Sequence, residues 1–237
     1  MTRAVGFVTI GQSPRVDIME EFERALPGAT LVQRGALDDL TDIEVAALAP
    51  SDGDEVLVSR LRTGRQVRVA HRHVDGRVQV CLDRLAEEGV RLAVLLCTGE
   101  FPRLVFGGVL LRPHRVLPHV VAAVAEGLPA DAPVRLGVML PDEAQTAHAQ
   151  TRWGARAAVT AVAASPYGDP RALAGAADTL KQAGASLVVM DCIGYTRRMQ
   201  QTVARAAGVP VVFATGAVAM IVRELAGAGA AAPAARP

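Results

Sequence analysis

Residues 89–99 read GVRLAVLLCTG, and residues 184–194 read GASLVVMDCIG. In each stretch a glycine that can end a helix precedes a continuous apolar run, which is typical of a buried parallel strand. A cysteine, Cys97 or Cys192, follows eight residues after that glycine, and another glycine comes two residues later. The resemblance of the two stretches predicts a duplicated α/β unit with one thiol at the carboxyl end of a strand in each copy.

The rest of the chain alternates predicted strands and helices, which is the pattern of an α/β fold with mainly parallel sheets flanked by helices. The strand containing Gly6 resembles the one containing Gly137, at an offset of 131 residues, whereas the two cysteines are 95 residues apart. The difference fits an insertion in the first copy, where residues 55–61 and 66–73 predict an extra β-hairpin. The other predicted strands are residues 4–10, 29–33, 135–140, 157–163 and 209–214, and the predicted helices are residues 17–26, 41–48, 74–88, 117–126, 143–153, 170–183, 197–207 and 217–226.

The composition excludes several classes of protein. The chain has 237 residues and a net charge of +1, which argues against a nucleic-acid footprint or a polybasic membrane surface. Lys181 is the single lysine, so Schiff-base or Walker-type lysine chemistry is not expected. Three cysteines without a C-x-x-C pair predict free thiols in a reducing cytoplasm and no metal site. No apolar run approaches the ~18 residues of a membrane span.

Cys97 and Cys192 each admit two interpretations. A strand-end cysteine can be a buried core residue, because cysteine is among the most buried residue types. The carboxyl ends of parallel strands also line ligand crevices, and nearby backbone N–H groups can lower a thiol pKa. The recurrence of the same position in both copies favours function. Cys81 has apolar neighbours at helical core spacing and is predicted to pack in the core.

The turn after the first strand, residues 11–15 (GQSPR), opens a helix. Its backbone N–H groups, the Ser13 hydroxyl and Arg15 could hold a carboxylate or a phosphate. The alternative is a polar helix-entry turn, because neither G-x-G-x-x-G nor G-K-[ST] is present. Glu100 and Asp191 adjoin the thiols and could tune them. None of the histidines has metal-ligand spacing, and His71 and His73 are predicted to share one face of the hairpin.

Residues 9–15 (TIGQSPR), 94–99 (VLLCTG) and 190–194 (MDCIG) together resemble the AroM family, over residues 1 to 227. That family is similar to the aspartate/glutamate racemase superfamily. The resemblance implies two pseudo-symmetric lobes with the active site between them, no cofactor, and a last helix that returns to the first lobe. The expected boundaries are residues 1–115 with 215–227 for the first lobe, 116–214 for the second, and a disordered tail at 228–237.

The resemblance also implies a mechanism. Cys97-Thr98 and Cys192 match the two cysteines of such racemases, whereas Ile193-Gly194 replaces the usual Thr-His or Thr-Glu, which argues against an Asp or Glu substrate. The leading hypothesis is an isomerase that moves the α-proton of a small carboxylate between two thiols. A one-thiol isomerase or decarboxylase and a non-catalytic protein that binds a small carboxylate or a phosphate metabolite remain alternative functions. Whether the protein forms a homodimer is left open. The candidate substrate-binding residues are Gly11, Gln12, Ser13, Pro14, Arg15, Thr98, Gly99, Glu100, Ile193, Gly194 and Tyr195.

Overall fold

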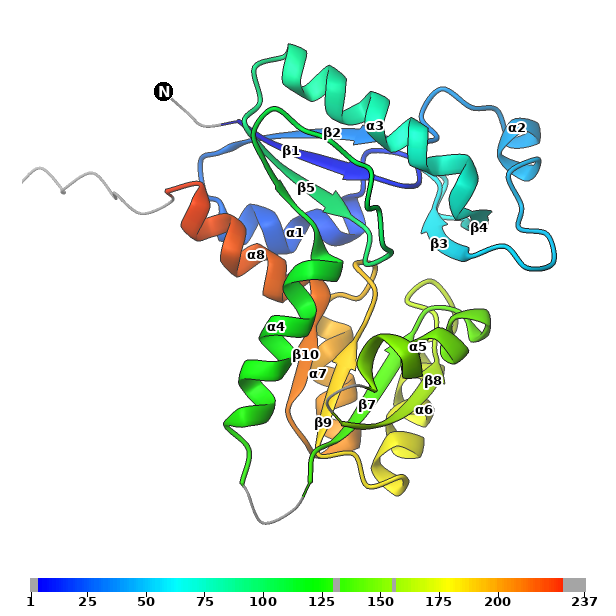
Figure 1. The fold of residues 1–237 in the computed structure, drawn as a ribbon, viewed down its shortest axis with the longest axis vertical. Coiled ribbons are helices and arrows are strands. Elements are labelled where there is room, and N and C mark those ends of the chain that lie inside the picture. The colour runs from blue at the N-terminus through cyan, green and yellow to red at the C-terminus, as the bar shows by residue number, and fades with distance from the viewer. Residues whose placement is uncertain (1–3, 130–132, 155–156, 228–237) are drawn as a thin grey trace, which may run out of the picture.

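The computed structural model describes residues 4–129, 133–154 and 157–227 of the chain. They form two four-stranded sheets, each with all its neighbouring strands parallel and with helices packed against it (Figure 1). The fold is therefore the predicted α/β class with two lobes, each named here by its sheet. The first sheet has the order β2-β1-β5-β6 and the second β10-β9-β7-β8, with β1 Ala4–Thr9, β2 Thr30–Gly35, β5 Leu92–Leu96, β6 Val109–Leu111, β7 Arg135–Leu140, β8 Ala158–Ala163, β9 Leu187–Met190 and β10 Val211–Phe213.

The two sheets have the same topology. In the first lobe β1 pairs with β2 and β5, and β6 lies outside β5; in the second, β7 pairs with β8 and β9, and β10 lies outside β9. The predicted duplication is thus confirmed at the level of strand order. The helices are α1 Val16–Ala25, α2 Asp42–Ala46, α3 His71–Glu87, α4 Pro113–Glu126, α5 Thr146–Trp153 with a preceding 3-10 turn at Glu143–Gln145, α6 Pro170–Gln182, α7 Arg197–Ala207 and α8 Ala214–Leu225.

A matched pair of glycines shows that the duplication extends to side-chain packing. A Cβ atom on Gly6 of β1 would lie 2.6 Å from Cδ1 of Leu85 on α3. A Cβ atom on Gly137 of β7 would lie 3.0 Å from Cδ1 of Leu180 on α6. In both lobes a glycine in a central strand lets a helix leucine approach the sheet closely. The same two positions therefore set the distance between helix and sheet in each lobe.

The insertion in the first lobe consists of α2 and an antiparallel hairpin, β3 Val56–Arg60 and β4 Gln66–Ala70. The hairpin confirms the prediction, but its second strand is shorter than expected. The prediction that His71 and His73 share a strand face is wrong, because α3 begins at His71 and both residues lie in its first turn. His71 Nδ1 lies 2.9 Å from Glu55 Oε2, and the ring packs edge-on against Phe101, which fixes the chain where strand gives way to helix.

Other elements also differ from the sequence prediction; α8, for example, begins at Ala214, three residues before the predicted start. β6 has only three residues, 109–111, which is too short to give a recognisable alternation. α4 begins at Pro113, four residues before the predicted start, and uses this proline in its first turn, where the missing N–H costs nothing. The predicted tail, residues 228–237, lies outside the described residues.

One hydrophobic core joins the two lobes. It includes β1 residues such as Phe7, β7 residues such as Val138, and Val218 of α8. Helix α8 packs against both α1 and α4, so the last helix lies at the junction between the lobes (Figure 1). The carboxyl ends of β1, β5, β7 and β9 face one another across this junction. No helix in the described ranges is long and apolar enough to cross a membrane.

Candidate active site between the lobes

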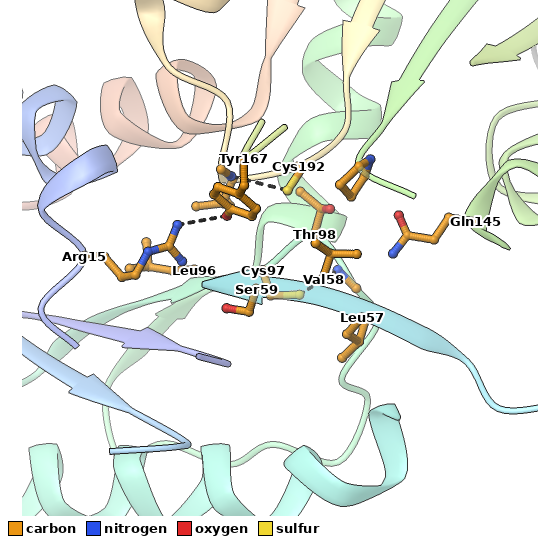
Figure 2. A pocket seen from close by; sticks show the side chains of 14 residues that line it. Arg15, Leu57, Val58, Ser59, Leu96, Cys97, Thr98, Gln145, Tyr167 and Cys192 are labelled. Atoms are coloured by element: carbon orange, nitrogen blue, oxygen red, sulfur yellow. Dashed lines mark hydrogen bonds between the residues drawn. The ribbon is translucent and has the colours of Figure 1, made fainter. Parts of the chain in front are cut away.

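Cys97 and Cys192 line the same buried cavity at the junction of the lobes (Figure 2). Cys97 directly follows β5, and Cys192 comes two residues after β9, so each thiol lies at the carboxyl end of the equivalent strand of its lobe. The cavity has a volume of about 30 Å³, room for about two water molecules. The lining residues are Arg15, Leu57, Val58, Ser59, Leu96, Cys97, Thr98, Gly99, Pro141, Gln145, Tyr167, Cys192, Ile193 and Gly194.

The two thiols are held in the same way. The backbone N–H of Gly99 donates to Cys97 Sγ at 3.3 Å, and the backbone N–H of Gly194 donates to Cys192 Sγ at 3.3 Å. A side chain of another segment also packs closely against each of these glycines. A Cβ atom would lie 2.9 Å from Leu57 Cδ2 at position 99 and 2.3 Å from the Tyr167 hydroxyl at position 194. The Cys-x-Gly spacing of the repeat therefore orients each sulfur and leaves room for the cavity wall.

Both thiols are neutral in this buried cavity. Burial raises the pKa of Cys97 and of Cys192 to about 12 each, since a thiolate would be desolvated there. The backbone N–H bonds lower these pKa values, as do Arg152 for Cys97 and Arg15 for Cys192, but burial outweighs them. The predicted effect of the neighbouring N–H groups on the thiol pKa is therefore present but smaller than the effect of burial, because one hydrogen bond does not replace the lost water.

A buried ion pair connects the two cysteine loops. The Asp191 carboxylate accepts from Trp153 Nε1 at 3.0 Å and lies 3.3 Å from Arg152 Nη1. The same Arg152 nitrogen donates to the carbonyl oxygen of Thr98 at 2.7 Å. Arg152 thus binds one residue beside each thiol. Burial, together with the charge of Arg152, lowers the pKa of nearby His114 to about 4, so this imidazole is neutral.

A second charge cluster faces the cavity from the first lobe. Arg15 is 3% exposed and makes a two-pronged contact with Asp17, at 2.9 and 2.8 Å. It also donates to the Tyr167 hydroxyl at 2.9 Å, across the junction (Figure 2). Arg60 lies 3.5 Å from the same Asp17 carboxylate. Two guanidinium groups and one carboxylate leave a net positive charge, which favours an anion in the cavity.

Seven of the residues predicted for the site line the cavity, and six do not. The loop after β1 contributes Arg15, but the Ser13 N–H and hydroxyl bind the Asp38 carboxylate at 2.6 and 2.7 Å. The donors expected to hold a ligand therefore hold an internal carboxylate, which also accepts from the Gly35 N–H. The predicted residues in the lining are Cys97, Cys192, Arg15, Thr98, Gly99, Ile193 and Gly194, and those outside it are Gly11, Gln12, Ser13, Pro14, Glu100 and Tyr195.

The residues outside the lining have other structural roles. Gln12 donates to the carbonyl oxygen of Leu37 and accepts from the Arg62 N–H, tying the loop to the insertion. The Tyr195 ring is fully buried, and its hydroxyl donates to the carbonyl oxygen of Ala164 at 2.7 Å. Glu100 points to solvent, with its side chain 64% exposed.

Sequence reasoning missed half of the cavity lining. Pro141 and Tyr167 follow β7 and β8, so the strand-end rule that singled out the cysteines also applies to them. Gln145 lies in the turn that leads into α5. No sequence pattern places the hairpin residues at the cavity. The side of an inserted hairpin that faces the site is determined by contacts with the other lobe. The missed residues are Leu57, Val58, Ser59, Leu96, Pro141, Gln145 and Tyr167.

The chain is thus a two-lobed α/β protein with a parallel sheet in each lobe and a cavity between them, and solved racemases and a decarboxylase share this fold. An unliganded arylmalonate decarboxylase is 16% identical, with a TM-score of 0.62 over 97% of this chain and 95% of that one. The glutamate racemase RacE1 from Bacillus anthracis is 12% identical, with a TM-score of 0.61 over 94% and 81%. The allantoin racemase of Pseudomonas fluorescens is 13% identical, with a TM-score of 0.54 over 95% and 92%. These similarities show a shared fold.

The chain belongs to the AroM family, which matches residues 5–226 under the description "AroM protein". No curated protein is significantly similar to it in sequence. Within the described residues, no three or more His, Cys, Asp or Glu side chains are grouped so that they could hold a metal ion.

Proposed function

We propose that this protein is a cofactor-independent isomerase that moves the α-proton of a small carboxylate between Cys97 and Cys192. The observation that carries the proposal is the equivalence of the two thiols. Each follows the equivalent strand of its lobe, each accepts a hydrogen bond from the N–H two residues later, and both line the same cavity. Two equivalent acid–base groups, one from each lobe, are what proton transfer across the two faces of one carbon requires.

In the proposed reaction, one cysteine acts as a thiolate and removes the α-proton. The C–H electrons move into the carboxylate to give an enediolate, and the opposite thiol then donates its proton to the other face of the carbon. The cysteines thereby exchange protonation states, and no proton or electron is gained overall. The net positive cluster of Arg15, Arg60 and Asp17 favours the carboxylate and the additional negative charge of the enediolate.

The raised pKa values restrict when the thiolate forms. With its pKa raised to about 12 by burial, a thiol in the cavity is almost entirely protonated at pH 7. Water around an open junction lowers the cost of charging the sulfur. Ionisation in the open state, followed by closure over the substrate, fits these conditions.

The test is α-deuteration in D₂O with a panel of amino and hydroxy acids, followed by NMR. The wild-type protein is expected to exchange the α-proton of its substrate and to racemise it. The Cys97→Ser and Cys192→Ser variants should each lose racemisation, because each removes one of the two proton-transfer groups. Racemisation that survives either substitution would contradict the two-thiol mechanism.

A one-thiol reaction is the second candidate, supported by the similarity of the fold to arylmalonate decarboxylase. It predicts release of CO₂ from a substituted malonate and tolerates the loss of one cysteine. A protein that only binds its ligand would be stabilised against heat by that ligand even without both thiols, and no solvent deuterium would enter the ligand. The two cysteine variants, alone and combined, separate these outcomes.

A further inference from the structure

We propose that the site takes a small hydroxy acid rather than an amino acid, and that Ser59 binds the hydroxyl group of this substrate. This proposal rests on the proposed function, because it concerns the substrate of the same cavity. It assigns a specificity-determining role to a residue of the inserted hairpin, which has no counterpart in the described residues of the second lobe.

The charges around the cavity argue against an ammonium group. Arg15 is the only charged residue in the described lining, and it is cationic. The carboxylate of Asp17 is occupied by Arg15 and Arg60. Asp191 contacts Trp153 and Arg152 through Oδ2, and its Oδ1 has no partner among the described residues, but Asp191 does not line the cavity. An ammonium group enclosed without a carboxylate partner costs several kcal/mol. A carboxylate with a neutral substituent meets no such penalty.

The Ser59 hydroxyl can form a hydrogen bond with a neutral hydroxyl group of the substrate. Its side chain lies in the cavity wall and is 1% exposed, and its hydroxyl has no hydrogen-bond partner among the described residues. A buried hydroxyl without a partner is unfavourable, so a ligand that pairs with it is favoured. Gly11 makes this position possible, because a Cβ atom there would lie 2.3 Å from Ser59 Oγ.

The hairpin that carries Ser59 is fixed by both lobes, which is what a specificity-determining residue requires. Gln145 Nε2 of the second lobe donates to the Val56 carbonyl oxygen at 2.8 Å. Arg68 of β4 contacts Asp142 at 2.8 Å. These contacts hold β3 against the cavity, where Figure 2 shows Leu57, Val58 and Ser59 along one wall. A hydroxyl on this strand therefore has a defined position relative to both thiols.

The test measures binding of three matched small acids, lactate, alanine and propionate, by calorimetry. The wild-type protein is expected to bind lactate more tightly than alanine and propionate. In Ser59→Ala the preference for the hydroxy acid over the unsubstituted acid should fall about 2- to 10-fold, the range for one neutral hydrogen bond. Thr63→Ala removes an exposed hydroxyl from the same hairpin and should leave the preference unchanged.

The outcomes separate the two proposals. Wild-type protein that prefers alanine, that binds the three acids equally or that binds none of them overturns the present inference, as does an unchanged preference in Ser59→Ala. Discrimination that depends on Ser59 but comes without α-deuteration of any acid overturns the isomerase instead. Thermal unfolding of Ser59→Ala provides the folding control, because removing an unpaired hydroxyl should leave the melting temperature unchanged or higher.

Discussion

The hydroxyl of Thr98 donates a hydrogen bond of 3.1 Å to the carbonyl oxygen of Asp191. Thr98 follows Cys97 and Asp191 precedes Cys192, so this bond joins the two cysteine loops across the lobe junction. It uses the Thr98 hydroxyl that would otherwise be a candidate ligand for substrate. Its position indicates that the hydroxyl sets the relative placement of the two sulfurs.

Replacing Thr98 with valine should therefore separate the cysteine loops while keeping the volume of the side chain. We expect the α-proton exchange rate to fall at least 10-fold, and the free energy of unfolding to fall by about 1–3 kcal/mol, because the buried Asp191 carbonyl oxygen loses a donor. Thr98→Ser keeps the hydroxyl and should retain most of the exchange rate. Equal rates for the valine and serine variants would contradict this role.

The glycines after the thiols should not tolerate a side chain. Gly194→Ala places a methyl group where the Tyr167 hydroxyl lies, so Tyr167 must leave its contact with Arg15. We expect a loss of stability of about 1–3 kcal/mol and a large loss of activity, measured by urea unfolding and α-deuteration. Gly76→Ala on α3 is the matched control, since no atom lies within 4 Å of its Cβ position and alanine favours a helix. Full activity in Gly194→Ala would show that the Tyr167 contact is dispensable.

Buried thiols should make the protein less stable at alkaline pH. Their folded-state pKa of about 12 lies above the ordinary value near 8.5–9, so the unfolded chain releases these protons first. The stabilisation is complete below pH 8.5 and is lost as the pH rises towards 12, by about 1.4 kcal/mol per pH unit for each thiol. Urea unfolding between pH 8 and pH 10.5 measures this slope.

In the double variant Cys97→Ala/Cys192→Ala, the fall of the free energy of unfolding with rising pH should lose the contribution of two thiols, whatever the stability of the variant at pH 7. Cys81 should still contribute, because burial raises its pKa to about 11. The Cys81→Ala variant provides the comparison, with a slope reduced by one thiol. An unchanged slope in the double variant would mean that Cys97 and Cys192 ionise in the folded protein as readily as in the unfolded chain.

The sequence predicts the repeat because the repeat depends on local signals. A helix-ending glycine such as Gly89 or Gly184, an apolar run and a strand-end cysteine recur at fixed spacing, and each follows from the backbone conformation of its own segment. The carboxyl ends of parallel strands meet at one edge, which is why both cysteines could be placed at the junction without knowledge of long-range contacts.

The remaining site residues depend on contacts between distant segments. Tyr167 enters the cavity because Gly194 leaves space for it and Arg15 binds its hydroxyl, and these two partners come from different lobes. Ser13 does not line the cavity, because its N–H and its hydroxyl both donate to the carboxylate of Asp38, on the loop after β2. No local sequence pattern predicts the positions of Tyr167 and Ser13, which is why the sequence of the helix-entry loop also fits an anion site.

The pair of Arg152 and Asp191 should be the most costly interaction of the site to break. The Asp191 side chain is 1% exposed, and Arg152→Met would leave its charge with the Trp153 N–H as its remaining hydrogen-bond donor. Removing one partner of a buried pair costs about 3–5 kcal/mol, because the other charge stays desolvated. Arg152→Met/Asp191→Asn removes both charges and should recover part of this loss. Urea unfolding of the two single variants and the double variant forms a cycle that isolates the coupling. Additive losses would show that Arg152 and Asp191 do not stabilise one another.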